Sequence, residues 1–130
     1  MHSLVLTLSF ICCSALGAAI RLGLTHLAKQ TIGQTIYATL FVNLMGAVCI
    51  GVFYVLFQQI WQLDKSWYLV LVAGLLGSLT TFSGFSLEVA DMLIRKQWLA
   101  ALFYSLSSVF FCITVTFLAL KLSHMWWAAK

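Results

Sequence analysis

The sequence predicts an all-α integral membrane protein with four transmembrane helices, in a single domain that covers residues 1–130. Two observations carry this prediction. Only 8% of the residues are charged and 63% are hydrophobic, whereas roughly a quarter of the residues of a soluble protein are charged. The apolar residues also form four long runs of at least ~20 residues, which is the length that a membrane-spanning helix needs. Lipid must therefore solvate most of the surface.

The four apolar runs set the expected spans at residues 4–24, 37–60, 67–94 and 98–120. The tryptophans lie near the ends of these runs, where amphipathic rings prefer the membrane interface: Trp61, Trp67, Trp98, Trp126 and Trp127. The first run is similar to a signal peptide, but it lacks a basic start and continues to Arg21, so we interpret it as a retained helix. We interpret the four cysteines as small apolar core residues, because they lie inside apolar runs without CxxC spacing.

The seven basic residues are scattered, so they form no patch that indicates a nucleic-acid partner. Four spans place both termini on one side of the membrane. That side carries Lys65, Lys121 and Lys130, and the other side carries Arg21, Lys29, Arg95 and Lys96. Because the two counts are almost equal, the positive-inside rule selects no orientation. Either a weak bias still suffices, or the protein inserts both ways and pairs with its inverted copy, which is the interpretation that we favour.

The third expected span contains the stretch GLLGSLTTFSGF at residues 74–85. Its three glycines weaken a helix, and its serines and threonines can satisfy backbone groups that a break sets free. We therefore expect this helix to be interrupted in the middle of the membrane, where free carbonyls and N–H groups can bind ions. Phe82 and Phe85 lie three residues apart on one face just after the break. They are either core residues or residues that face the route of an ion.

Polar residues inside the other spans follow helical spacing. In the second span, Thr39, Asn43 and Gly46 share one stripe, although an asparagine in a membrane helix often only joins helices. In the fourth span, hydroxyl and thiol groups recur every four residues, as a functional stripe or as a packing seam: Tyr104, Ser108, Cys112 and Thr116. Among the acidic residues, we expect Asp91 to form an ordinary helix-end pair with Arg95.

Three segments resemble the Fluc (CrcB) family of fluoride channels. GAAIRLG in the first span resembles the family motif GxxxR, and ATLFVNLMGAVCIG resembles TLxVNxxGxxxxG. GLLGSLTTFSGF resembles GxxGGxTTFSTF. The sequence departs from the family pattern at four positions: Leu22, Ser78, Gly84 and Cys112. Gly84 stands where the pattern has a threonine, so a hydroxyl group is lost there.

The resemblance implies an antiparallel, dual-topology homodimer in the cytoplasmic (inner) membrane, with two narrow pores that export fluoride passively and no enzymatic activity. It implies a structural Na⁺ at the dimer centre, held by the backbone carbonyls of Gly77 and Thr80. It implies these residues along the fluoride path: Thr39, Asn43, Phe82, Ser83, Phe85, Tyr104 and Ser108. Arg21, at the end of the first helix, would lie near the pore mouth, and Glu88 would lie close to the polar path.

Two other functions fit four short spans. A small dual-topology exporter of cationic drugs needs a carboxylate in the first span to exchange protons, and residues 4–24 contain no Asp or Glu. A non-transporting membrane anchor for a larger complex gives no reason for a polar break in the third span. The sequence therefore favours the channel over both alternatives.

Overall fold

The computed structural model describes residues 2–62 and 64–128, and this part of the chain consists of helices and short connections. The elements in chain order are α1 (His2–Ile32), α2 (Ile36–Val55), η1 (Leu56–Ile60), α3 (Lys65–Leu69), η2 (Val70–Leu76), α4 (Gly77–Leu79), α5 (Phe82–Ile94) and α6 (Trp98–Ala128). Within the described residues, four spans are long and apolar enough to cross a membrane: Ser3–Ile32, Ile36–Val55, Lys65–Ile94 and Trp98–Ala128. The predicted class, a four-span all-α membrane protein, is confirmed.

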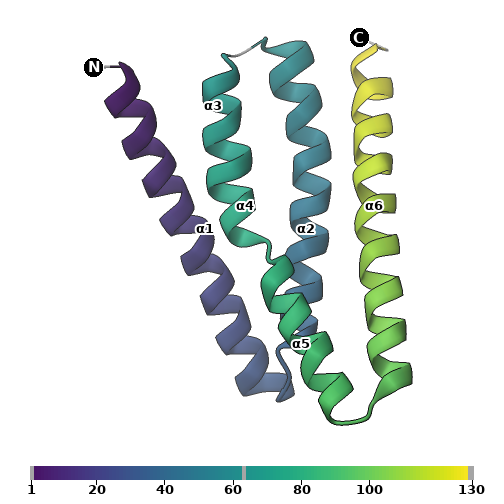
Figure 1. Cartoon of the computed structure of the whole chain (residues 1–130). Helices are drawn as coiled ribbons and strands as arrows, with labels where there is room; N and C mark the ends of the chain where they lie inside the picture. The colour runs from purple at the N-terminus through teal and green to yellow at the C-terminus, as the bar shows by residue number, and fades with distance from the viewer. Residues whose placement is uncertain (1, 63, 129–130) are drawn as a thin grey trace.

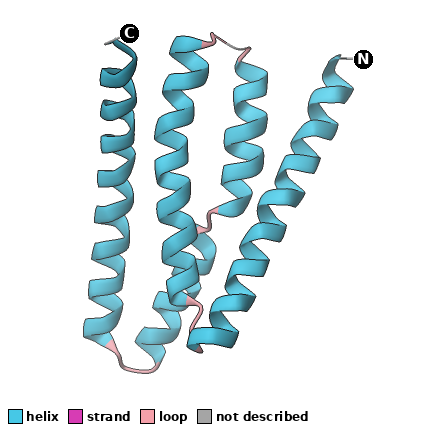
Figure 2. Cartoon of the chain, turned by 180° about the vertical axis from the view of Figure 1, so that it is seen from behind, coloured by secondary structure: helices cyan, strands magenta, loops and turns pink. Residues whose placement is uncertain are grey.

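The spans run alternately up and down, so both ends of the described chain lie at the same end of the bundle (Figure 1). The turn between α5 and α6 lies at the opposite end. α2 packs along α6, and α5 contacts both of them. α1 is tilted relative to α2 and α6 and packs against η2 and α4, on the other side of α2 from α6 (Figure 2). Most large apolar side chains on the outer faces are exposed, as a lipid environment requires.

α1 is longer than expected. We expected the first span to end at residue 24, but the helix continues to Ile32. Residues 25–32 contain no glycine or proline, and Gly33 then ends the helix with a φ of 76° and donates its N–H to the Lys29 carbonyl at 3.1 Å. Arg21 therefore does not end the first helix, and the prediction that placed it there was wrong.

The third span is interrupted between α4 and α5, as the sequence predicts. Thr80 and Thr81 have extended backbones, with φ/ψ of −79°/156° and −149°/112°. A π-helical stretch, η2, precedes the break, and such stretches have wider turns than an α-helix. α5 then starts with Thr81 as its N-cap, because the Thr81 hydroxyl accepts the Gly84 N–H at 2.9 Å. The break lies at the middle of the span Lys65–Ile94.

Two small clusters of buried side chains hold the bundle together, one on each side of the break. The first joins α5 to α6 and contains Phe85, Met92, Ala101 and Tyr104. The second joins α2 to the helical segment before the break and contains Val42, Leu76 and Leu79. The break therefore lies between two packed regions, beside the middle of α2.

Candidate ion site at the break of the third span

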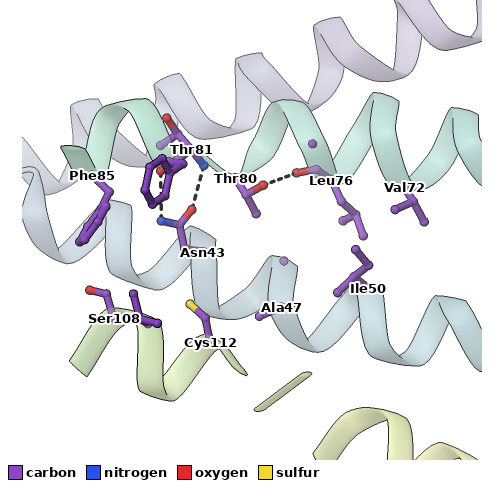
Figure 3. Close-up of a pocket in the computed structure, with 14 residues that line it drawn as sticks. Asn43, Ala47, Ile50, Val72, Leu76, Thr80, Thr81, Phe85, Ser108 and Cys112 are labelled. Carbon is purple, nitrogen blue, oxygen red and sulfur yellow. Dashed lines mark hydrogen bonds between the residues drawn. The ribbon is translucent and has the colours of Figure 1, made fainter. Parts of the chain in front are cut away.

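Asn43 on α2 binds both main-chain groups of Thr81. Its Oδ1 accepts the Thr81 N–H at 2.8 Å, and its Nδ2 donates to the Thr81 carbonyl at 3.2 Å (Figure 3). A backbone group without a partner inside a membrane costs several kcal/mol, so this single side chain stabilises the extended residue at the break. The sequence pattern singled out Asn43 but gave no sign of this contact.

The break leaves the carbonyls of residues 77–80 without their usual helical donors, those of Gly77 and Thr80 among them. In a continuous helix the Thr81 N–H would donate to the Gly77 carbonyl, and the Gly84 N–H would donate to the Thr80 carbonyl. Instead, the Thr81 N–H donates to Asn43, and the Gly84 N–H donates to the Thr81 hydroxyl. Gly77 and Thr80 are the two residues that the resemblance implies as sodium ligands. Their carbonyls are hard oxygen ligands of the kind that alkali and alkaline-earth cations prefer, so these residues fit that ion.

Thr80 lies directly on α2 at Gly46. A Cβ atom added at Gly46 would collide with Thr80 Cγ2, so only glycine lets the threonine methyl group approach α2 this closely. The Thr80 hydroxyl turns the other way and donates to the Leu76 carbonyl at 2.8 Å. Thr80 is therefore held by its methyl group on one side and by its hydroxyl on the other.

A cavity of about 350 Å³ lies beside the break. It is bounded by α2, by the segment around the break and by α6, and Figure 3 shows its lining. Its lining residues are Asn43, Gly46, Ala47, Ile50, Val72, Leu76, Gly77, Thr80, Thr81, Phe82, Phe85, Ser108, Val109 and Cys112. The cavity thus brings together residues that the sequence or the resemblance selected from three different spans, namely Asn43, Gly77, Thr80, Phe82, Phe85, Ser108 and Cys112.

Two polar groups on this cavity, on Ser108 and Asn43, have donor capacity that the described chain does not use. The Ser108 hydroxyl is buried, with the residue only 7% exposed, and it has no hydrogen-bond partner. By contrast, the hydroxyl of Ser105, one turn earlier on α6, donates to the Ala101 carbonyl of its own helix at 2.7 Å. Asn43 donates only one of its two N–H bonds to Thr81. A buried hydroxyl without a partner costs about 1–3 kcal/mol, so a ligand that accepts this hydrogen bond would be stabilised here.

Phe82 and Phe85 contact each other at the edge of the cavity, with ring centroids 5.6 Å apart. Phe85 is 9% exposed and also contacts the Tyr104 ring at 5.3 Å, so it has a packing role. Phe82 is 77% exposed and packs on little else within the chain. The core interpretation therefore fits Phe85 but does not account for Phe82.

Glu88 forms a second polar cluster, below the break on α5. Its Oε1 accepts the hydroxyls of Thr35 and Thr39, each at 2.8 Å, and its Oε2 accepts the Tyr104 hydroxyl at 2.8 Å. This cluster ties α5 to both α2 and α6. Thr35 was missed because it precedes the expected start of the second span, although it continues the four-residue spacing of Thr39 and Asn43.

Three other selected residues lie away from the cavity. Ser83 is exposed, and its hydroxyl is 3.2 Å from the Thr81 hydroxyl. Arg21 is half-buried on α1. Asp91 forms the predicted ion pair with Arg95, at 2.8 Å on the exposed end of α5.

The fold and this cavity define a four-span membrane protein with an interrupted third span, an arrangement typical of transport proteins. Residues 8–120 match the family described as "CrcB-like protein, Camphor Resistance (CrcB)", and the chain belongs to this family. It is 39% identical over 114 residues to a protein of Haemophilus influenzae (strain PittGG) named fluoride-specific ion channel FluC. These 114 residues are 87% of this chain and 89% of the relative.

Two further relatives carry the same name. The protein of Pasteurella multocida (strain Pm70) is 40% identical over 113 residues, which is 87% of this chain and 88% of the relative. The protein of Paracidovorax citrulli (strain AAC00-1) is 34% identical over 128 residues, which is 98% of this chain and the whole of the relative. The similarity therefore covers all four spans, the break included.

Proposed function

We propose that the protein is a fluoride channel that lets fluoride leave the cell passively across the cytoplasmic (inner) membrane and so limits its toxicity. One observation supports this function above the others: the buried Ser108 hydroxyl without a partner, which lines a cavity together with the spare N–H of Asn43. The names of the relatives agree with it.

The chemistry of these donors suits a small, strongly hydrated anion. Fluoride that enters a narrow pore loses water, and the pore must replace that water with hydrogen-bond donors. A hydroxyl and a side-chain amide can both donate, and bonds to an ion are stronger than bonds between neutral groups. Neither group carries a full positive charge, so the ion is stabilised without being trapped. A membrane potential that is negative inside then drives the anion outward by ~2.3 kcal/mol per 100 mV.

The aromatic residues extend this path. The edge of a phenyl ring is the positive end of its quadrupole and can face an anion. Phe82 and Phe85 both line the cavity and contact each other, and Phe85 contacts Tyr104, whose hydroxyl reaches Glu88. In the proposed path, fluoride passes from the Ser108 hydroxyl and the Asn43 amide along these ring edges. Thr39, which contacts Glu88, and Ser83, which contacts Thr81, also contribute to the path.

The functional unit in this proposal is an antiparallel homodimer with two pores. The cavity at the break is partly open, and Phe82 is left exposed beside it, so an inverted second copy has a surface to cover. In that dimer, Gly77 and Thr80 of each protomer hold a structural Na⁺ through the carbonyls that the break sets free. Four such oxygens would form a site for a hard cation. Arg21 lies near the mouth of the pore.

The experiment that tests the function is fluoride efflux from proteoliposomes. The purified protein is reconstituted into vesicles loaded with potassium fluoride, and efflux is followed with a fluoride electrode while valinomycin sets the potassium conductance. We expect fast efflux that follows the potassium potential and needs no proton gradient. Vesicles that release no fluoride would support the membrane anchor instead. Efflux that requires a proton gradient would point to an exporter.

A further inference from the structure

One side of the cavity at the break carries a thiol next to the hydroxyl without a partner. Ser108 and Cys112 lie one helical turn apart on α6, and both line the cavity (Figure 3). Ser108 is 7% exposed and its Oγ has no partner within the described chain. Cys112 is half-buried and is a free thiol. The two side chains therefore present one soft and one hard ligand to the same cavity.

Cys112 differs from the other three cysteines in its position. None of the others lines this cavity. Cys12 is exposed on the outer face of α1, Cys13 packs against Gly74, and Cys49 packs against the cluster around Val42. All four are free thiols, so any thiol reagent that enters the membrane can reach several of them. Only a reaction at Cys112 places a new group inside the cavity.

We propose that Cys112, with the Ser108 hydroxyl beside it, is a binding site for soft, thiophilic metal ions, and that its occupation closes the fluoride path. The closing step rests on the proposed function, whereas the binding step does not. Thiolates are the protein ligands that soft metals prefer, and the cavity of about 350 Å³ is large enough for a metal ion on the sulfur. The Ser108 hydroxyl supplies a second, weaker ligand one turn away.

The reaction with the probe, mercury(II) chloride, is balanced without a change in oxidation state. The Cys112 S–H bond and one Hg–Cl bond break, and one Hg–S bond forms. The products are the protein-bound S–Hg–Cl group, one proton and one chloride ion. Mercury(II) chloride is a neutral molecule, so it can enter a bilayer and approach the cavity without passing through an anion pore. A dithiol added afterwards removes the metal and restores the free thiol.

The test compares fluoride efflux from proteoliposomes before and after mercury(II) chloride in three chains. In the original chain we expect nearly complete loss of efflux that a dithiol restores. A chain with Cys12→Ala, Cys13→Ala and Cys49→Ala keeps only Cys112 and should be blocked as strongly. The Cys112→Ser chain should retain its own starting rate, whatever that rate is, because each chain serves as its own reference. A block of Cys112→Ser, or no block of the chain that retains only Cys112, would overturn the inference.

The mass of the intact protein separates this inference from the proposed function. In the chain that retains only Cys112, mercury(II) chloride should add one mercury per protomer. If the original protein carries no fluoride before mercury is added, the proposed function fails, and the mass measurement alone decides the binding site. If mercury binds Cys112 while fluoride efflux continues, the proposed closing step is wrong and the channel function stands. If no mercury binds, the site itself is wrong.

Discussion

Asn43 and Thr81 are joined by two hydrogen bonds that connect the middle of α2 to the break in the third span. The amide oxygen accepts at 2.8 Å and the amide nitrogen donates at 3.2 Å. An asparagine that only joined helices would not need to match both main-chain groups of one residue. The match requires a side chain with both a donor and an acceptor, and no other common side chain of this length has both.

Asn43→Asp should therefore weaken the break and also stop conduction. The carboxylate can still accept the Thr81 N–H, but it places a negative oxygen against the Thr81 carbonyl and removes the spare donor from the cavity. We expect a loss of about 1–3 kcal/mol in the free energy of unfolding and little fluoride efflux. Thermal unfolding in detergent and the efflux assay measure the two effects. Gln34→Glu makes the same amide-to-acid change at an exposed position and should behave as the original chain. Normal efflux through Asn43→Asp would leave Asn43 with a structural role alone.

Phe82→Ile gives a clean test of the aromatic path, because Phe82 is exposed and packs little within its own chain. Isoleucine remains apolar and large but has no ring edge for an anion. We expect a dimer of normal size that passes little fluoride. Phe85→Ile should show the same loss together with about 1–3 kcal/mol lower stability, because Phe85 is buried. Phe103→Ile, which changes another exposed phenylalanine, on α6, is the matched control. Efflux at the original rate through both Phe82→Ile and Phe85→Ile would remove them from the path.

Gly46 and Thr80 allow a double-mutant test of the break. Gly46→Ala should displace the break, because the new Cβ collides with Thr80 Cγ2, and we expect weaker dimers and less efflux. Thr80→Ser removes that methyl group but keeps the hydroxyl that donates to Leu76, so it should conduct and keep its carbonyl ligand. The double variant should recover much of what Gly46→Ala loses. A double variant as impaired as Gly46→Ala alone would show that the contact between these two residues does not limit the site.

Glu88→Gln should weaken the packing of α5 against α2 and α6. Three hydroxyls donate to the Glu88 carboxyl group, and an amide replaces one accepting oxygen with a donor that faces another donor. We expect a loss of ~1.5–3 kcal/mol, the range for hydrogen bonds to charged groups. Asp91→Asn is the control, since its exposed pair with Arg95 contributes only ~0–1 kcal/mol. Equal melting temperatures for the two variants would contradict the role of Glu88 as the centre of its cluster.

Orientation in the membrane should respond to very few charges, because the two sides carry nearly equal numbers of basic residues. Gln62→Lys with Ser66→Lys adds two charges at the end of the bundle that carries the termini. This change should produce one dominant orientation and fewer antiparallel dimers. Gln34→Lys with Gln97→Lys adds two charges at the other end and should favour the opposite orientation. Reporter fusions at the C-terminus measure both, and a single orientation of the unaltered chain would contradict the homodimer.

The sequence predicts the spans and the break well, because both depend on local chemistry. Apolar runs of sufficient length identify the spans, and the cluster of glycines and hydroxyl residues identifies the interruption. The end of α1 was predicted less well: polar residues after Leu24 suggested a loop, but hydropathy reports the membrane boundary and not the helix end. The helix continues through polar residues until Gly33 stops it.

The site could be predicted only as a set of residues. Spacing within one helix placed Thr39 with Asn43 and Ser108 with Cys112, because residues four apart share a face. It could not show that Asn43 reaches Thr81, which lies 38 residues later in the chain, or that Glu88 collects hydroxyls from two other helices. Such contacts depend on how the helices pack. The resemblance supplied the carbonyls of Gly77 and Thr80 as sodium ligands, and that assignment stays a prediction.

The two polar clusters have a mechanical consequence for α5. Thr35, Thr39 and Asn43 lie on successive turns of one face of α2, and through Glu88 and Thr81 they fasten α5 along that face. α2 thus holds the second half of the third span in place. The first half packs mainly against α1 instead. A change in the tilt of α1 would therefore move the first half of the third span relative to α5, which α2 holds in place. The backbone at Thr80, between the two halves, would have to absorb that movement.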